Sequence, residues 1–268
     1  MTYTPCNNCT ARVLMVLAML VLTAPLLAAQ ERPALINGRP NLNGLWQAVN
    51  SAHWNLEAHA AHALPQSAEM GAIAAVPAGQ SVVVGGTIPY LPQALAKREE
   101  NRAGWPATDP EASCYLPGIP RATYMPYPFR IIQGEDDLMF AYSYAAANRV
   151  IHMQEHSEAP VDMWMGWSNG HWEGNTLVIE VSSNDDRTWL DRAGNHHSYM
   201  MKVTERYTPL SSDHMMYEAT MDDPLTFSAP WTIRMPLYRI LDQNAELLEF
   251  KCIEFAEEFL YGEFYKRD

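Results

Sequence analysis

The residues best suited to chemistry gather at positions 184–198, where fifteen positions hold three aspartates, two arginines, one tryptophan and two histidines. A neutral histidine accepts a proton near pH 7, and a nearby carboxylate can orient its ring. His197 is therefore the candidate base, with Asp185 or Asp191 as the group that orients it. Because neighbouring side chains of an extended chain face opposite sides, only one of His196 and His197 can point into a pocket.

A candidate acid follows a few residues later. If the predicted strand at 199–207 begins early enough, Glu205 and His197 lie on the same face and look into one interior, which makes Glu205 the candidate acid. The alternative is structural: Glu205 then pairs with Arg121 or Arg206, since carboxylates serve ion-pair networks as often as active sites.

Six further side chains could bind a substrate. The chain contains 15 Met, 13 Tyr and 8 Trp residues, which are large side chains that adapt to irregular apolar ligands. Packing in the core explains most of these residues. The more specific interpretation is that some of them line an apolar pocket. The candidates are Arg121, as the group that binds an oxyanion, and Tyr124, Tyr142, Tyr144, Trp167 and Trp189.

Motifs for metal and nucleotide cofactors are missing from the sequence. There is no HExxH, no cysteine cluster, no GxGxxG and no P-loop. The pairs His59 with His62 and His152 with His156 have helical spacing, which leaves a zinc or copper site built from distant histidines as an alternative. We therefore expect no metal and no other cofactor. A GxSxG motif is also missing, which disfavours a serine hydrolase.

The elements that must position these residues are strands. From Phe129 onward apolar and polar residues alternate with period two, and Gly, Asn, Asp and Ser separate the runs. Short spacings without alternating helices predict a mainly β fold, an antiparallel barrel or sandwich of the lipocalin type. The predicted strands are 129–133, 138–144, 149–153, 163–168, 176–182, 199–207, 215–221, 231–238 and 247–253.

A less regular region precedes these strands. Residues 30–128 are predicted to be an irregular and partly helical region that packs around the strands, with short helices at 53–62 and 92–103. Trp46 is predicted to be buried in the core. Residues 129–253 supply the antiparallel strands, and 254–268 a final amphipathic helix. No repeat or linker marks a second domain, so residues 30–268 are expected to form one β-rich domain.

The first 29 residues predict a signal peptide. Arg12 precedes a short apolar run, and small residues follow it, so we expect cleavage and no membrane span afterwards. The protein is then periplasmic or secreted, where Cys114 and Cys252 either pair or remain separate buried thiols. The formal net charge of −13 disfavours nucleic acid as a partner. The oligomeric state cannot be inferred.

Several segments resemble those of a family of exported bacterial proteins. The resemblance covers nearly all of the chain after the leader and includes CYLPGIPRATYMPYPF at 114–129. It implies one domain, and it assigns no catalytic role to any residue. The other matching segments are 88–92, 94–98, 147–153, 165–168, 172–174, 188–195, 205–207, 236–239 and 248–252.

Two functions follow from these observations. The first is an exported enzyme that acts on an apolar or aromatic small molecule by acid–base chemistry, as a lyase, isomerase or hydrolase. The second is a periplasmic carrier of a lipid or aromatic ligand that catalyses nothing. A protein without a pocket is the third possibility. A cavity beside His197 and Glu205 would favour the first two.

Overall fold

The structure is a computed structural model that describes residues 34–64, 75–254 and 256. The predicted signal peptide lies outside these residues, and so does the predicted C-terminal helix apart from Glu254 and Ala256. None of the helices in the described part of the chain could cross a bilayer, because none combines enough length with enough apolar residues.

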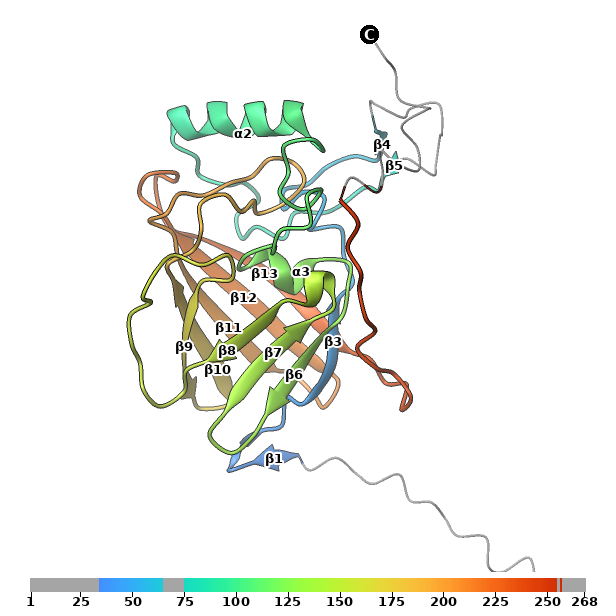
Figure 1. Ribbon diagram of the computed structural model, residues 1–268, viewed down its shortest axis with the longest axis vertical. Helices are drawn as coiled ribbons and strands as arrows, with labels where there is room; N and C mark the ends of the chain where they lie inside the picture. The colour runs from blue at the N-terminus through green and yellow to red at the C-terminus, as the bar shows by residue number, and fades with distance from the viewer. Residues whose placement is uncertain (1–33, 65–74, 255, 257–268) are drawn as a thin grey trace, which may run out of the picture. The chain divides into compact units, whose positions relative to one another are not determined.

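A single antiparallel sheet dominates the fold and curls into a nearly closed barrel (Figure 1). The mainly β prediction is therefore correct, and of its two forms the barrel is the observed one. The sheet meets itself where His152, after the last strand on one edge, bridges Asn169 on the other. Within the described residues the nine strands follow the order β8 (Asn148–Ile151), β7 (Leu138–Tyr142), β6 (Phe129–Gln133), β3 (Gly44–Ala48), β13 (Trp231–Arg239), β12 (His214–Asp222), β11 (Lys202–Pro209), β10 (Thr176–Ser182) and β9 (Trp167–Glu173).

Alternating burial explains why these segments are strands. In β13 every second residue from Trp231 to Arg239 is buried, and β11 and β12 show the same period. The turn between β9 and β10 contains Gly174 at φ +59°, a conformation that glycine adopts without a steric penalty. Seven of the nine predicted strands therefore correspond to observed strands, with small shifts at their ends.

Three predicted elements are wrong. The strand expected at 163–168 is a turn, because Gly166 has φ +63° and donates to the Met163 carbonyl, and β9 begins only at Trp167. The helix expected at 53–62 does not form, because the Leu56 N–H donates to a distant carboxylate instead of to a carbonyl four residues earlier.

The third error is the strand at 247–253. Both edges of β13 are already paired, one with β12 and the other with the N-terminal strand β3, so the sheet has no place for a further strand there. The segment instead runs outside the barrel as an irregular strap. It is tied to the rest of the protein by the Cys114–Cys252 disulfide, which confirms that these two cysteines pair.

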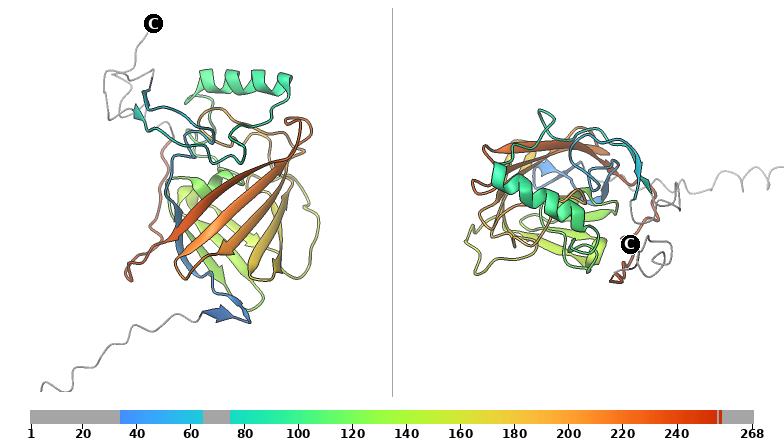
Figure 2. Two further views of the ribbon diagram at one scale, coloured as in Figure 1. Left: turned by 180° about the vertical axis from the view of Figure 1, so that it is seen from behind. Right: turned by 90° about the horizontal axis from the view of Figure 1, so that it is seen from above.

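The predicted helix at 92–103 is confirmed as α2 (Pro92–Gly104), which crosses one end of the barrel (Figures 1 and 2). It is held there by an ion pair of 2.8 Å between Arg98 and Glu57. Below it lies Gly194, packed so closely that a Cβ atom would be 2.6 Å from the Arg98 carbonyl oxygen. The helix therefore rests directly on the 184–198 segment that holds the candidate site residues.

Several short elements lie outside the nine-stranded sheet and α2. They are β1 (Leu35–Ile36) paired with β2 (Arg39–Pro40), β4 (His62–Ala63) paired with β5 (Ala75–Val76), α3 (Arg121–Tyr124) and the 3-10 turn η3 (Tyr144–Ala146).

Candidate functional site

A cleft of about 700 Å³ opens at the end of the barrel that α2 covers. We call it the mouth cleft; its walls are α2, the 107–115 segment and the 184–198 segment. Of the predicted site residues, Trp189 and His197 lie in its lining. The lining also contains Ser113, Tyr115, Trp164, Asp186, Arg187 and Leu225.

The 184–198 segment is a compact hairpin organised by Asp191. Trp189 and His196 form an antiparallel bridge, and Gly194 makes the predicted turn at φ +84°. The carboxylate of Asp191 accepts from the backbone N–H groups of Leu56 (2.8 Å), Ala193 (2.9 Å) and Asn195 (3.2 Å), and from the Asn195 side chain (2.6 Å). Burial raises the Asp191 pKa, which these donors oppose.

His197 is buried, and both of its ring nitrogens are bound within the protein. One ring nitrogen, Nδ1, lies 2.9 Å from the Ser198 carbonyl oxygen, so Nδ1 carries the proton and donates. The other, Nε2, lies 2.6 Å from the Thr188 hydroxyl and accepts from it. Burial lowers the His197 pKa, which favours the neutral ring that this arrangement requires.

Neither expected carboxylate orients His197. Asp185 accepts two hydrogen bonds from the Arg187 guanidinium, at 2.8 and 2.5 Å, and that guanidinium lowers the Asp185 pKa. Asp191 is occupied by its own hairpin, as described above. The Thr188 hydroxyl and the Ser198 carbonyl take the orienting positions instead.

Glu205 lies inside the barrel, away from the mouth cleft. Its carboxylate pairs with Arg149 and accepts from the hydroxyls of Tyr207 (3.0 Å) and Tyr217 (2.8 Å). The expected shared interior with His197 is not observed. The reason is that β11 begins only at Lys202, after a turn that interrupts the alternation on which the prediction depended.

The cation beside Glu205 is neither of the two that the sequence suggested. Arg206 pairs with Glu173 at 2.8 Å on the exposed face of the sheet. Arg121 is enclosed by Asp109, which accepts two hydrogen bonds of 2.9 Å from its guanidinium, and by Glu111 at 2.5 Å. Arg121 is 1% exposed, so it fixes a wall of the cleft and does not face a substrate oxygen.

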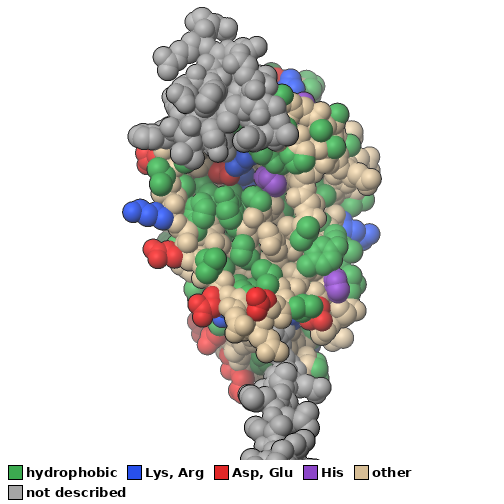
Figure 3. All heavy atoms as spheres, turned by 90° about the vertical axis from the view of Figure 1, so that its right-hand side faces the viewer, with side chains coloured by type: hydrophobic (Ala, Val, Ile, Leu, Met, Phe, Trp, Pro, Cys, Tyr) green, Lys and Arg blue, Asp and Glu red, His purple; other side chains and the backbone are tan. Residues whose placement is uncertain are grey.

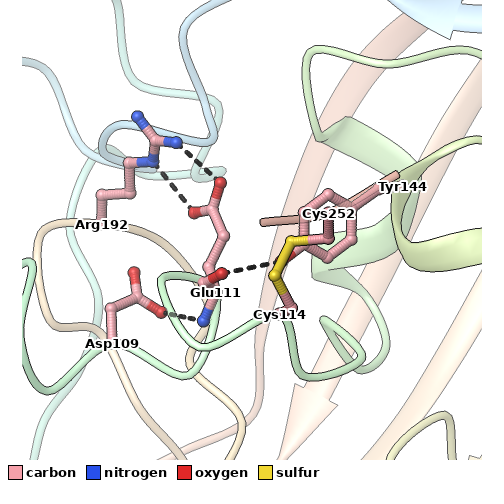
Figure 4. Close-up of a disulfide and its surroundings, with 6 residues drawn as sticks. All are labelled: Asp109, Glu111, Cys114, Tyr144, Arg192 and Cys252. Carbon is pink, nitrogen blue, oxygen red and sulfur yellow. Dashed lines mark hydrogen bonds and ion pairs between the residues drawn. A yellow bond between two sulfur atoms is a disulfide. The ribbon is translucent and has the colours of Figure 1, made fainter. Parts of the chain in front are cut away.

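Glu111 joins this network to the 184–198 hairpin (Figure 4). Its carboxylate accepts from the Arg192 guanidinium at 2.9 and 2.7 Å, and its backbone N–H donates to Asp109 at 2.9 Å. Burial opposes ionisation of Glu111, but Arg192 and Arg121 outweigh it and lower the pKa to about 2. The network is therefore ionised at neutral pH and anchors the 107–115 segment.

Two of the predicted tyrosines are core residues. The Tyr124 hydroxyl donates to the Leu190 carbonyl at 2.7 Å, and the side chain is 1% exposed. Tyr142 packs against Phe129 with ring centroids 5.5 Å apart, and burial raises its pKa to about 12. Neither residue is in the lining of the mouth cleft.

The remaining two predicted binding residues also lie elsewhere. Tyr144 donates from its hydroxyl to the Glu111 carbonyl at 2.9 Å, on the far side of the 107–115 segment. Trp167 stacks on His152 with ring centroids 4.2 Å apart, where the barrel closes. Trp189 and His197 are thus the only predicted site residues that line the mouth cleft in the described structure.

Sequence reasoning missed an aromatic stack at the rim of the cleft. Tyr115 lies parallel to Trp164 with ring centroids 4.7 Å apart, and the Arg187 guanidinium carbon lies 4.5 Å from the Trp164 ring centroid. The three residues come from segments far apart in the chain, so the sequence shows their aromatic and cationic types but not that they meet.

Potential metal ligands do not converge. Within residues 34–64, 75–254 and 256, no three His, Cys, Asp or Glu side chains are grouped so that they could hold a metal ion. His156 and His171 come within 6.5 Å between ring centroids, but their polar partners are the Gly170 carbonyl and the Glu173 carboxylate.

Comparison with known proteins adds no relative. The chain matches no protein-family model, no curated protein and no solved structure.

Proposed function

We propose that the protein is a carrier that binds a small molecule with an aromatic or apolar body and hydrogen-bonding groups. The observation that carries this proposal is the mouth cleft, whose volume of about 700 Å³ falls within the range of sites for small molecules. Such sites commonly lie at the mouths of β-barrels.

The cleft offers both kinds of contact. Trp189, Leu225 and the Tyr115–Trp164 stack present apolar surface. The side chains of Ser113 and Asp186 line the same space, and in the described residues neither makes a hydrogen bond within the protein. They are therefore available to a ligand, and the mixed lining favours an aromatic molecule with polar substituents over a simple hydrocarbon.

Binding without turnover is favoured because the candidate catalytic groups are already engaged. Both nitrogens of His197 have partners, and the carboxylates of Asp185, Asp191 and Glu205 are held by protein donors. A general base must be within hydrogen-bond reach of the proton that it removes.

One observation favours catalysis as a second candidate. The Thr188 hydroxyl donates to neutral His197 at 2.6 Å, which is the contact between a hydroxyl nucleophile and its base. In this second proposal a hydrolase or lyase would use Thr188 and His197. Thr188 is 2% exposed, so a substrate would need the hairpin to open.

We also place the protein outside the cytoplasm, in the periplasm or the medium. The Cys114–Cys252 disulfide supports this location, because disulfides persist in oxidising compartments and are rare in reducing ones.

The test compares two neighbouring residues that face opposite ways. Ser113 lines the mouth cleft and Ala112 does not, so Ser113→Trp blocks the cleft and Ala112→Trp is the matched control. Thermal unfolding is followed with a panel of phenols, indoles and aromatic acids. A ligand at a hundredfold excess over its Kd stabilises by about 2.7 kcal/mol, which raises Tm by about 5–10 °C.

We expect at least one compound to stabilise the wild type and Ala112→Trp but not Ser113→Trp. If Ser113→Trp does not fold, the exposed Leu225→Trp provides a second block. A panel in which no compound stabilises the wild type would overturn the proposal, and so would a panel in which every stabilising compound acts on Ser113→Trp as strongly as on the wild type. Turnover of a bound compound that is lost in Thr188→Val would favour the second candidate.

A further inference from the structure

A second cavity, of about 650 Å³, lies on the other side of the 107–115 segment. We call it the strap cavity, because residues 250–253 of the irregular strap form one wall. The end of α2 and the 105–112 segment form the opposite wall. Ala107 and Asp109 border both cavities, so one short segment of chain separates the strap cavity from the mouth cleft.

Aromatic side chains make the strap cavity more apolar than the mouth cleft. The Tyr127 and Tyr144 rings each pack on Phe250, with centroids 4.8 and 5.3 Å apart, and Trp105 lies in the same lining. Figure 3 views the side of the molecule along which the strap runs, and apolar side chains cover much of the middle of that face. The lining suits a flat apolar body.

The charges of the lining favour an anion. Glu111 and Arg192 form an ion pair at 2.7 Å, and Asp109 is paired with Arg121 immediately behind the wall. These four charges cancel. Lys251 is the further charged residue of the lining, and it makes no ion pair within the described residues. The cavity therefore has a net positive charge in a protein whose formal charge is −13.

We propose that the strap cavity is a second binding site, which takes a small aromatic anion such as an aromatic carboxylate. The ring lies among Tyr127, Tyr144 and Phe250, and the acidic group lies toward Lys251. The Cys114–Cys252 disulfide maintains the site, because it fixes the strap wall to the separating segment (Figure 4). In the described residues, the strap from 247 onward has one further hydrogen bond to the body, from Ser143 to the Leu248 carbonyl.

The test uses two fluorescent probes that share one skeleton. 8-Anilinonaphthalene-1-sulfonate is anionic, and N-phenyl-1-naphthylamine is its neutral counterpart. We expect the sulfonate to bind the wild type at one site, and Ala112→Trp to weaken it at least tenfold by filling the cavity. Ser113→Trp, which faces the mouth cleft, should leave its Kd unchanged. This pair of variants separates failure of this proposal from failure of the carrier proposal.

A variant of Lys251 tests whether charge contributes to binding. Lys251→Glu should weaken the sulfonate by about three- to tenfold, as expected for an exposed charge pair, and leave the neutral probe unchanged. If Ala112→Trp does not fold, Phe250→Ala removes the aromatic wall and should weaken both probes. Loss of sulfonate binding in Ser113→Trp but not in Ala112→Trp would overturn the proposal. Sulfonate binding that is seen only when the chain is truncated after Ala256 would also overturn the proposal, because residues 257–268 would then be the occupant of the strap cavity.

Discussion

Replacing Arg149 with methionine should destabilise the barrel strongly. The change leaves the carboxylate of Glu205, which is 0% exposed, without its cation. In the described structure, the hydroxyls of Tyr207 and Tyr217 would remain as its hydrogen-bond donors. Removing one partner of a buried ion pair costs about 3–5 kcal/mol, because the other charge stays desolvated and uncompensated. A domain of this size then loses about 6–20 °C in Tm.

The double variant Arg149→Met/Glu205→Gln separates the ion pair from its packing. Glutamine keeps the volume of Glu205 and still accepts from the tyrosine hydroxyls, but it carries no charge. We expect the double variant to lie within about 1–2 kcal/mol of the wild type, because no unpaired buried charge remains. The free energy of unfolding is measured by urea titration at pH 7, for the wild type, both single variants and the double variant.

The reasoning is refuted if Arg149→Met costs less than about 1 kcal/mol, or if the double variant is no more stable than that single variant. The same proteins test whether Glu205 belongs to the ligand site. Because Glu205 and Arg149 are not in the lining of the mouth cleft, Glu205→Gln should leave the Kd of a mouth-cleft ligand unchanged. A large loss of binding with normal stability would restore the role that the sequence suggested.

Three further predictions concern stability. Replacing both Cys114 and Cys252 with serine should cost up to about 5 kcal/mol in urea unfolding, because the disulfide closes a loop of sequence separation 138; equal midpoints would contradict this. Burial beside a guanidinium lowers the His53 pKa from 6.5 to about 3. The unfolded chain therefore takes up the proton first, and stability on the order of a few kcal/mol is present above pH 6.5 and is lost as the pH falls toward 3. His53→Gln should flatten this slope between pH 7 and 4, and an unchanged slope would refute the assignment. Asp191→Asn should cost about 1–3 kcal/mol, because its amide group turns a donor toward the N–H of Leu56; an unmoved urea midpoint would count against that.

Local patterns predicted much of the barrel. The alternation in β13 and the turn at Gly174 depend on neighbouring residues, so the chain read in short windows reveals them. The pairing of Cys114 with Cys252 could be suggested by compartment, but only the fold shows that the two meet. The place of β3 between β6 and β13 has no local signal, because it depends on which edges remain unpaired.

The site was harder to predict for the same reason. Chemically suitable residues were recognised, but their partners come from distant segments. Glu205 meets Arg149 across the barrel interior, and the Thr188 hydroxyl takes the position next to His197 that was assigned to a carboxylate. Composition shows which side chains could react. It cannot show which of them already have hydrogen-bond or ion-pair partners in the folded protein.

The central position of β3 has a consequence for synthesis of the chain. Arg239 binds the carbonyl of Asn41, 198 positions earlier, and the edge of β3 that pairs with β13 stays open until that C-terminal strand has been made. Contacts of such high sequence separation form slowly. Because β13 is the last strand of the sheet to be synthesised, the sheet stays incomplete until residue 239 has been made. A partly synthesised chain therefore keeps two open strand edges, one on β3 and one on β12, until β13 pairs with both of them.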